Sequence, residues 1–468
     1  MTVFKKLGNV RYWWRDGLFN RICGNAGLMF AGGICGQGLS FVALMLIARA
    51  LGPDRMGVFA LIQAYVMTVG LILSFQSWQG MIRFGARALE NDDRKAFRSL
   101  LKFGLLLDGG AAVFSTVVSM GGVFIIGRWQ GWSTEIIQTT ALFSLLILFR
   151  VVGLPQSVFR LHNRFRIVAG LQLSVALMRV VTVGVAFFLT GRIWVFLLLW
   201  GGSEAINNMI AMILAWRLLI KEGHGGFLAS PLKDLTREHP GILRFFLTTK
   251  VTSSLQLGVK EFDIFLVAAI LGTGATGVYK VVREIARIPA VLVGPIQQAI
   301  YPELARLWAS GLAAQFVRMN KRLSAIGGAI GFTVWLAITL GAPWILRLLA
   351  GDEYADARWV LTFYMLSVAL FCLGVSLRPA MLSIGKPGKE LASYAISSAL
   401  YFVSLPLLTY VFGLLGVGLA QVVFQGSWLN CMLLGLRGPV RRALADEASA
   451  AGPDPSPDAP AGVASTST

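Results

Sequence analysis

A train of apolar stretches, each about 20 residues long, runs through the chain, and short connectors between them hold most of the charged residues. A helix of about 20 apolar residues is long enough to cross the hydrocarbon core of a bilayer. The composition agrees, because 56% of the residues are hydrophobic and only 14% are charged. We therefore predict an all-α, polytopic membrane protein of about twelve transmembrane helices.

The predicted spans can be tested against the basic residues of the connectors. The spans cover residues 26–48, 57–80, 100–126, 135–157, 168–190, 194–216, 246–271, 277–300, 324–350, 358–383, 391–411 and 414–436. Connectors on one side hold 27 Lys and Arg residues, and those on the other side hold six. Basic residues stay on the cytoplasmic side, so both termini are predicted to be cytoplasmic. Because the net charge of +19 is spread over alternate connectors, no nucleic-acid partner is expected.

The two halves of the chain resemble each other at a constant offset of 220 residues. Leu51-Gly52 and Gly57-Val58-Phe59 recur as Leu271-Gly272 and Gly277-Val278-Tyr279. Each copy falls in the turn between the first and second helices of a six-helix set, which predicts parallel repeats and is typical of transporters. The predicted domains are a basic interfacial segment (1–25), an N-terminal six-helix lobe (26–218), a cytoplasmic linker (219–245), a C-terminal six-helix lobe (246–436) and a disordered cytoplasmic tail (437–468).

Ionisable residues are concentrated in the seventh and eighth predicted spans. They are Lys250, Lys260, Glu261, Asp263, Lys280, Arg283, Glu284 and Arg287. Each costs roughly 2.5–3.5 kcal/mol at the bilayer centre on insertion scales, so they are expected to face water or protein. Helical spacing places positions 280, 283, 284 and 287 on one face.

Two interpretations of this charged set stay open. In the first, Lys260, Lys280, Arg283 and Arg287 line a cationic cavity and bind the substrate. In the second, the charges form a structural or gating network, with Glu261, Asp263 and Glu284 as the ion-pairing members. Arg179, near the middle of the fifth predicted span, is a further candidate for substrate binding. Arg150 lies closer to the cytoplasmic side and is expected to reach the membrane surface.

Three groups of residues carry a resemblance to a known family. They are Ala48-Arg49-Ala50-Leu51-Gly52-Pro53 with Gly57-Val58-Phe59; Arg160 with Arg164-Phe165-Arg166; and Asp263 with Leu271-Gly272, Gly277-Val278-Tyr279 and Arg283. Over residues 25–436 the chain resembles the polysaccharide transport family of the multidrug/oligosaccharidyl-lipid/polysaccharide exporter superfamily.

This resemblance implies a flippase of the bacterial inner membrane. Its expected substrate is a polyprenyl-diphosphate-linked oligosaccharide used for O-antigen, capsule or exopolysaccharide assembly. Membrane lipids, a polysaccharide polymerase and a chain-length regulator are the expected partners. A cationic cavity suits the diphosphate, because a close charge pair gains about 4 kcal/mol at an effective dielectric constant near 20.

Other classes of protein fit the sequence less well. A cation-coupled multidrug or small-solute exporter of the same superfamily is the alternative, and it would favour intramembrane carboxylates such as Asp108 and Glu204. A major-facilitator carrier would show a Gly-and-Arg motif in the second connector. A membrane glycosyltransferase would need a sizeable outer loop, and the sequence contains no nucleotide-binding motif, metal cluster or nucleophile triad. We expect a non-enzyme without cofactor or metal.

Overall fold

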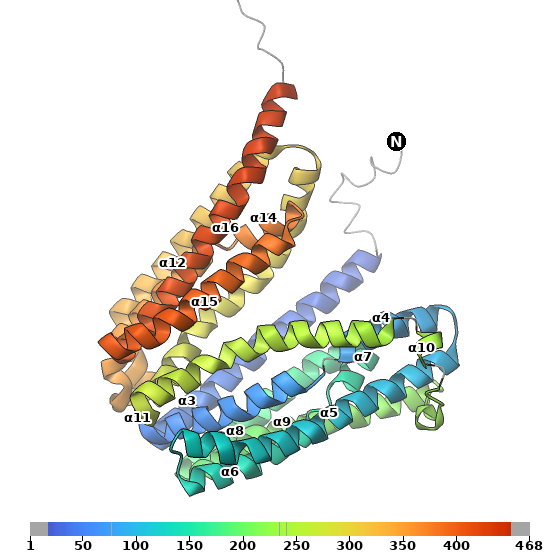
Figure 1. Cartoon of the computed structure of the whole chain (residues 1–468), viewed down its shortest axis with the longest axis horizontal. Coiled ribbons are helices and arrows are strands. Elements are labelled where there is room, and N and C mark those ends of the chain that lie inside the picture. The colour runs from blue at the N-terminus through green and yellow to red at the C-terminus, as the bar shows by residue number, and fades with distance from the viewer. Residues whose placement is uncertain (1–16, 76, 234, 240, 451–468) are drawn as a thin grey trace, which may run out of the picture. The chain divides into compact units, whose positions relative to one another are not determined.

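The computed structural model is built of helices joined by short loops (Figure 1). It describes residues 17–450 except 76, 234 and 240. Side chains are described for residues 32–449, apart from those three and 248–249, 251–261, 290–292, 294–295 and 298–299. Throughout the described chain no strand occurs, so the predicted all-α fold is confirmed.

The helices of the first half are α3 (Gly17–Leu73), α4 (Ser77–Glu90), α5 (Arg94–Trp129), α6 (Thr134–Ser144), η1 (Leu145–Phe149), α7 (Gly153–Leu161), α8 (Phe165–Leu189), α9 (Ile193–Lys221), η2 (Phe227–Ala229) and α10 (Leu235–Glu238). The second half contains α11 (Ile242–Ala309), α12 (Ala313–Leu349), η3 (Asp352–Ala357), α13 (Arg358–Leu373), α14 (Leu377–Ser383), α15 (Pro387–Phe412) and α16 (Leu414–Ala450). Residues 1–16 and 451–468, in the predicted terminal segments, lie outside the described part.

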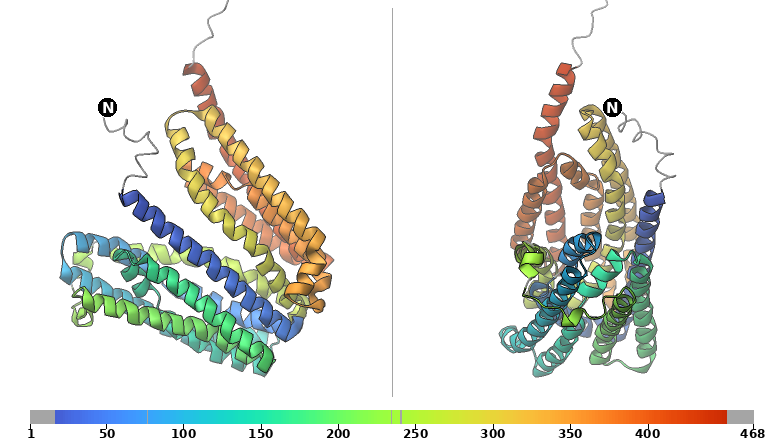
Figure 2. Two further views of the ribbon diagram at one scale, coloured as in Figure 1. Left: turned by 180° about the vertical axis from the view of Figure 1, so that it is seen from behind. Right: turned by 90° about the vertical axis from the view of Figure 1, so that its right-hand side faces the viewer.

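The chain forms two compact units. Within the described part, the first contains residues 17–288 together with 339–362 and 404–419. Within it, α3 packs against α8, α8 against α9, and α5 against α4 and α6 (Figures 1 and 2). Close approach depends on small residues, because a Cβ atom on Gly36 of α3 would lie 3.0 Å from the carbonyl oxygen of Gln172 in α8. Small residues at such contacts are usual in membrane helix pairs.

The second unit contains residues 289–338, 363–403 and, as far as the chain is described, 420–450. Its core joins α11, α12, α14 and α16 through buried apolar side chains, among them Leu304, Phe316, Met381 and Met432. Helix α16 continues to Ala450, past the end of the last predicted span at 436.

Ten helical segments are long and apolar enough to cross a membrane within the described part of the chain. The difference from the twelve predicted spans comes from two places where consecutive helices run together. The segment Gly32–Glu90 takes in one predicted span and most of another, and the described segment Phe262–Pro289 of α11 covers parts of two others. At 57 and 68 residues, α3 and α11 are each longer than one crossing needs.

A glycine with left-handed backbone geometry interrupts each of these two long helices. Gly52 has φ 68° and ψ 174° in α3, and Gly272 has φ 82° and ψ −175° in α11. Only glycine adopts this region without strain. The two positions are 220 residues apart, so the structure repeats the backbone break that the sequence repeat marks.

The two copies of the repeat contact each other directly, immediately after their breaks. A Cβ atom on Gly57 would overlap the carbonyl oxygen of Thr273, and one on Gly277 would overlap that of Pro53. Thr273 and Pro53 are themselves equivalent in the repeat. The contact is therefore reciprocal, as expected for two related elements that meet across a local two-fold axis.

A methyl group at this crossing should destabilise the protein. We expect Gly57→Ala to lower the free energy of unfolding by about 3 kcal/mol, at the upper end of the usual cost of overpacking, since a backbone atom occupies the space. Gly121→Ala is the matched control, because nothing lies within 4 Å of its Cβ position. Melting temperatures of the purified variants test this, and an unchanged melting temperature for Gly57→Ala would contradict it.

The segment after α9 is held against α5 and α9 of the first unit. The Phe227 side chain is fully buried, with its ring 5.0 Å from that of Trp216. The carboxylate of Glu238 accepts a hydrogen bond from the Ser99 hydroxyl at 2.7 Å and lies 3.3 Å from the Lys95 ammonium. These contacts fix the chain between α9 and α11 onto the first unit.

All three histidines of the chain lie at this end of the first unit. The ring of Phe97 contacts both His162 and His224, and a ring nitrogen of His239 lies 3.0 Å from a backbone carbonyl oxygen. Burial lowers the pKa of His162 below its usual value of 6.5, which Glu222 partly opposes. Burial, Arg98, His162 and Arg94 lower the pKa of His224, and Glu222 opposes this shift too.

Attachment of this segment should weaken in acid. Because the folded-state pKa values of His162 and His224 are lowered, the unfolded state binds more protons, and stability falls as the pH drops below 6.5. We expect faster hydrogen exchange in residues 222–239 at about pH 5.5 than at about pH 7.5, after correction for the intrinsic rate. The variant His162→Gln/His224→Gln should show a weaker pH dependence. Equal corrected protection at both pH values in the unmodified chain would refute the expectation.

Candidate substrate-binding site

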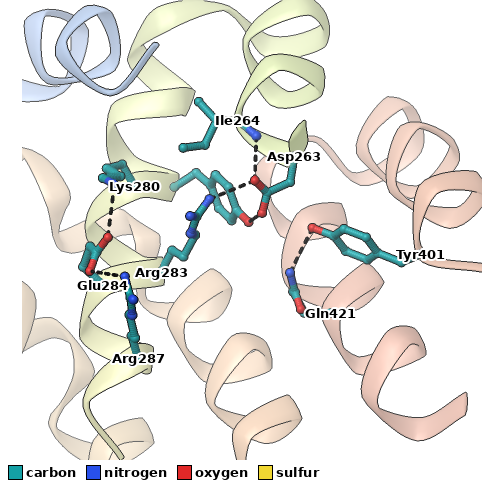
Figure 3. A network of polar contacts seen from close by, with 9 residues as sticks. Asp263, Ile264, Lys280, Arg283, Glu284, Arg287, Tyr401 and Gln421 are labelled. Atoms are coloured by element: carbon teal, nitrogen blue, oxygen red, sulfur yellow. Dashed lines mark hydrogen bonds and ion pairs between the residues drawn. The ribbon is translucent and has the colours of Figure 1, made fainter. Parts of the chain in front are cut away.

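The predicted charged face of α11 consists largely of internal ion pairs (Figure 3). The Lys280 ammonium lies 3.1 Å from Oε1 of Glu284, and both side chains are mostly buried. The Arg283 guanidinium lies 2.8 Å from Oδ1 of Asp263, and the Tyr279 hydroxyl donates to the other oxygen of that carboxylate. The break at Gly272 lies between Asp263 and Arg283 in α11, so the ion pair joins the two arms of the helix.

Arg287 differs from the other cations of this face. Its guanidinium is 62% exposed and lies 3.9 Å from Oε2 of Glu284, too far for a hydrogen bond. Figure 3 shows the Glu284 carboxylate between Lys280 and Arg287. The ion pairs of Figure 3 join three cations to the two carboxylates of Asp263 and Glu284. This network therefore has one positive charge in excess. Lys260 and Glu261, predicted members of the set, lie outside the described side chains.

The equivalent positions of the first repeat are not charged. Residues 43, 60, 63, 64 and 67 are Ala, Ala, Gln, Ala and Met, and the first four are buried. The ionic network is therefore an addition of the second repeat to a shared helical frame. The ion pairs across and along α11 agree with a structural or gating network. The exposed guanidinium of Arg287 agrees with a cationic substrate cavity. The role of these residues in binding or gating stays a prediction.

Arg179, the remaining predicted site residue, lies in a different place. It projects from α8 toward α9, where Oε2 of Glu204 is 3.1 Å away and the hydroxyl oxygen of Ser203 is 3.2 Å away. Its guanidinium also lies 4.4 Å from the ring centroid of Trp200, within the range of a cation–π interaction. The structure thus holds Arg179 on the α8–α9 pair and joins Asp263, Lys280, Arg283, Glu284 and Arg287 into the separate network on α11.

Arg179 and Glu204 line a polar pocket of about 400 Å³ within the first unit. This volume lies in the usual range for ligand sites, roughly 300–1,000 Å³. Besides apolar residues from α7, α8 and α9, its lining contains Arg150, Arg179, Glu204, Gln156, Gln172, Asn207 and Asn208. The α8–α9 pocket, as we name it, therefore combines two guanidinium groups, one carboxylate and four amides.

The polar groups of the α8–α9 pocket are only partly satisfied by the protein. The Arg150 guanidinium is 4.0 Å from Glu204, which already pairs with Arg179. The Ser174 hydroxyl donates to the side-chain oxygen of Asn207 at 3.1 Å. The amide nitrogen of Asn208 is buried and has no hydrogen-bond partner among the described residues. A ligand rich in oxygen atoms would satisfy such donors.

Sequence reasoning missed most of this pocket. Arg150 was expected to reach the membrane surface, but it lines the pocket beside Glu204. The four amides are spread over α7, α8 and α9 and give no periodic signal of their own. The sequence identifies Glu204 only as an intramembrane carboxylate. Because Arg179 lies on another helix, the spacing of the two residues gives no sign that they form an ion pair.

Another buried carboxylate holds the pocket's helices in place. Asp108 of α5 accepts a hydrogen bond at 2.5 Å from the hydroxyl of Ser77, the first residue of α4. A Cβ atom on Gly153, the first residue of α7, would overlap the same carboxylate. The carboxylate thus lies against the starts of two helices, where unsatisfied N–H groups favour a negative or strongly accepting partner. Helix α7 then carries Gln156 into the pocket.

Known proteins resemble this chain in sequence and in fold. The family described as "Polysaccharide biosynthesis protein" matches residues 22–308, more than half of the chain. The chain belongs to this family. It is 25% identical over 356 residues to the Escherichia coli (strain K12) "Inner membrane protein YghQ", covering 75% of this chain and 98% of the relative. A second protein of that strain, whose name refers to O-antigen transport, is 25% identical over 179 residues, 38% of this chain and 41% of its own length.

The fold has solved counterparts. An inward-facing multidrug resistance MATE family transporter of the MOP superfamily superimposes with a TM-score of 0.67, covering 88% of this chain and 96% of that one. The sequences are 15% identical, so this similarity concerns the fold alone. The family match and the helices long enough to cross a bilayer together identify a multi-pass membrane protein of the polysaccharide biosynthesis family.

The carboxylate of Glu204 should be needed for a stable pocket. Glu204→Gln removes the counter-charge of Arg179 and Arg150 with little change of shape. We expect it to lower the free energy of unfolding by about 3 kcal/mol, the lower end for breaking a buried pair, since Glu204 is partly exposed. The double variant Glu204→Gln/Arg179→Gln should recover part of this loss. The exposed Glu90→Gln serves as the control, and equal melting temperatures for Glu204→Gln and Glu90→Gln would contradict the assignment.

Proposed function

We propose that the protein moves a polyprenyl-diphosphate-linked oligosaccharide from the cytoplasmic to the periplasmic leaflet, for lipopolysaccharide, capsule or exopolysaccharide assembly. The family match and the relative named for O-antigen transport support this substrate class. Transport proceeds by alternating access, with both termini in the cytoplasm as the basic connectors indicate. In this proposal the protein acts as a transporter and not as an enzyme.

The observation that carries the proposal is the chemistry of the α8–α9 pocket. Guanidinium groups bind phosphate oxygens with paired hydrogen bonds, and amides bind sugar hydroxyls as donors and acceptors. Both kinds of group converge in this pocket, between helices that cross the membrane. The unpartnered amide of Asn208 is the donor most in need of a ligand oxygen.

The cations of α11 take a second part in the proposed function. Arg287 supplies an accessible positive charge for the diphosphate, while Lys280 and Arg283 support it through their ion pairs with Glu284 and Asp263. Lys260 joins the binding group and Glu261 the ion-pairing group, as the sequence predicts. The polyprenyl tail stays in the lipid, so only the polar head requires a protein path.

A cation-coupled multidrug or small-solute exporter is the alternative function. The buried carboxylate of Asp108 favours it, because coupling by protons or sodium ions requires an acidic group inside the membrane. A drug exporter would not be expected to change the pool of lipid-linked sugars. The two functions are therefore separable by one analysis of lipids.

Deleting the gene should cause a polyprenyl-diphosphate oligosaccharide to accumulate while the corresponding surface glycan disappears. Mass spectrometry of membrane lipids and an assay of surface glycan measure the two effects. Complementation with Arg287→Gln or Asn208→Ala should restore the glycan poorly. Losing a hydrogen bond to a charged group costs about 1.5–3 kcal/mol. We therefore expect the transport rate of Arg287→Gln to be lower by a factor of about ten or more.

The exposed Arg128→Gln is the matched control and should complement fully. Membrane levels of each variant must equal those of the unmodified protein, so that a lost glycan reports transport. Unchanged lipids and glycan in the deletion strain, with no paralogue present, would overturn the flippase and make the exporter the leading function. Full complementation by both test variants would instead reject the assigned residues.

A further inference from the structure

A second cavity of about 550 Å³ lies where α8 begins and α9 ends. It is lined by Asn163, Arg164, Arg166, Ile167, Arg217, Leu218 and Lys221. Four of these residues are cations, and none is acidic. We name this cavity the basic cavity; its floor is formed by the buried Leu218 and the half-buried Ile167.

The cations of the basic cavity differ from their neighbours in having no protein partner. Among the residues that the structure describes, none of the four is ion-paired. Other cations at the same end of the unit are engaged. The Lys102 ammonium donates to the carbonyl oxygen of Ser230 at 2.9 Å, and the Arg160 guanidinium lies 4.2 Å from the ring centroid of Trp78. The four exposed cations thus lie together in one cavity with no carboxylate in ion-pairing distance among the described residues.

Helix polarity explains only half of this cluster. Arg217 and Lys221 lie in the last turns of α9, where a cation is favourable. Arg164 and Arg166 lie at the start of α8, where the helix dipole disfavours a cation. Arg164 occupies the N-cap position, and no side chain accepts a hydrogen bond from the first N–H groups of α8. An arginine side chain has no acceptor to offer. The Ile167 N–H already donates to the backbone carbonyl of Arg164, which leaves the N–H groups of Phe165 and Arg166 for an anion.

The cavity also lies at the ends of two helical segments that are long and apolar enough to cross a membrane, the level at which we expect lipid head groups. Membrane-spanning segments end at its edge, with Phe165–Leu189 beginning there and Ile193–Lys221 finishing there. The surrounding connectors belong to the side predicted to be cytoplasmic. Basic pockets between membrane helices on that side bind the head groups of anionic lipids.

We propose that the basic cavity binds the phosphate group of a membrane lipid at the cytoplasmic surface. The uncapped N–H groups of α8 and the four cations supply the donors and the charge, and the acyl or polyprenyl chains remain in the bilayer. This site is separate from the α8–α9 pocket, and its occupancy does not depend on the proposed cargo. The phosphate can belong to a phospholipid or to a polyprenyl diphosphate.

Two pairs of substitutions on different helices test the site in the full-length protein. Native mass spectrometry in detergent, titrated with phosphatidylglycerol or phosphatidylcholine, measures lipid binding by Arg164→Gln/Arg166→Gln and by Arg217→Gln/Lys221→Gln. Each cation contributes roughly fivefold to binding of an anionic lipid, so either pair should weaken phosphatidylglycerol roughly 25-fold. Phosphatidylcholine should bind weakly to every variant. If one pair fails to fold, as judged by its melting temperature, the other still tests the site.

The control pair Arg318→Gln/Arg322→Gln removes the same charge from exposed positions of α12 outside the cavity. Loss of phosphatidylglycerol binding in both cavity pairs but not in the control supports the site. Equal loss in all three pairs would overturn it, because general surface charge would then explain binding. Competition by undecaprenyl diphosphate stronger than by phosphatidylglycerol assigns the site to the lipid-linked cargo, and the reverse order assigns it to phospholipid. Binding of inorganic pyrophosphate without either lipid would reject a lipid site.

Discussion

The reciprocal crossing of the two repeats is the constraint on which the central part of the structure depends. Gly57 lies against the backbone of Thr273, and Gly277 lies against that of Pro53, so neither position has room for a side chain. Inside a bilayer such contacts are held by close packing, since lipid tails are as apolar as the side chains and give little hydrophobic drive. Each crossing element follows a glycine break, at Gly52 or Gly272, that sets its direction.

Most buried charges in the described parts of the spans lie close to an opposite charge or to the start of a helix. Asp108 lies at the starts of α4 and α7, where unsatisfied N–H groups favour an accepting carboxylate. Glu204 of α9 forms an ion pair with Arg179 of α8. Asp263 forms an ion pair with Arg283 across the break in α11. These matched groups hold broken and tilted helices in place. We expect ligands to bind at the less well matched groups, such as the Asn208 amide and the exposed Arg287.

Much of this architecture could be predicted from the chain. The length of each apolar stretch predicted the spans, because a bilayer sets a minimum length for a crossing helix. The backbone N–H and C=O groups of a span must also bond to each other, which favours helices. The constant offset between the halves determined the equivalent turns, and the structure repeats the backbone break at both. The pairing of Lys280 with Glu284 also follows from helical spacing, since residues four apart share a face.

Tertiary structure alone decided which of the polar residues meet. Arg179 and Glu204 are 25 positions apart on different helices, and the rotation of each helix sets whether they pair or point away. The same holds for the amides of the α8–α9 pocket and for the cations of the basic cavity, where α8 begins beside the end of α9. A sequence records which groups a helix carries, and periodicity gives its apolar face. Contacts between helices depend on crossing angles and small-residue packing that no single segment encodes.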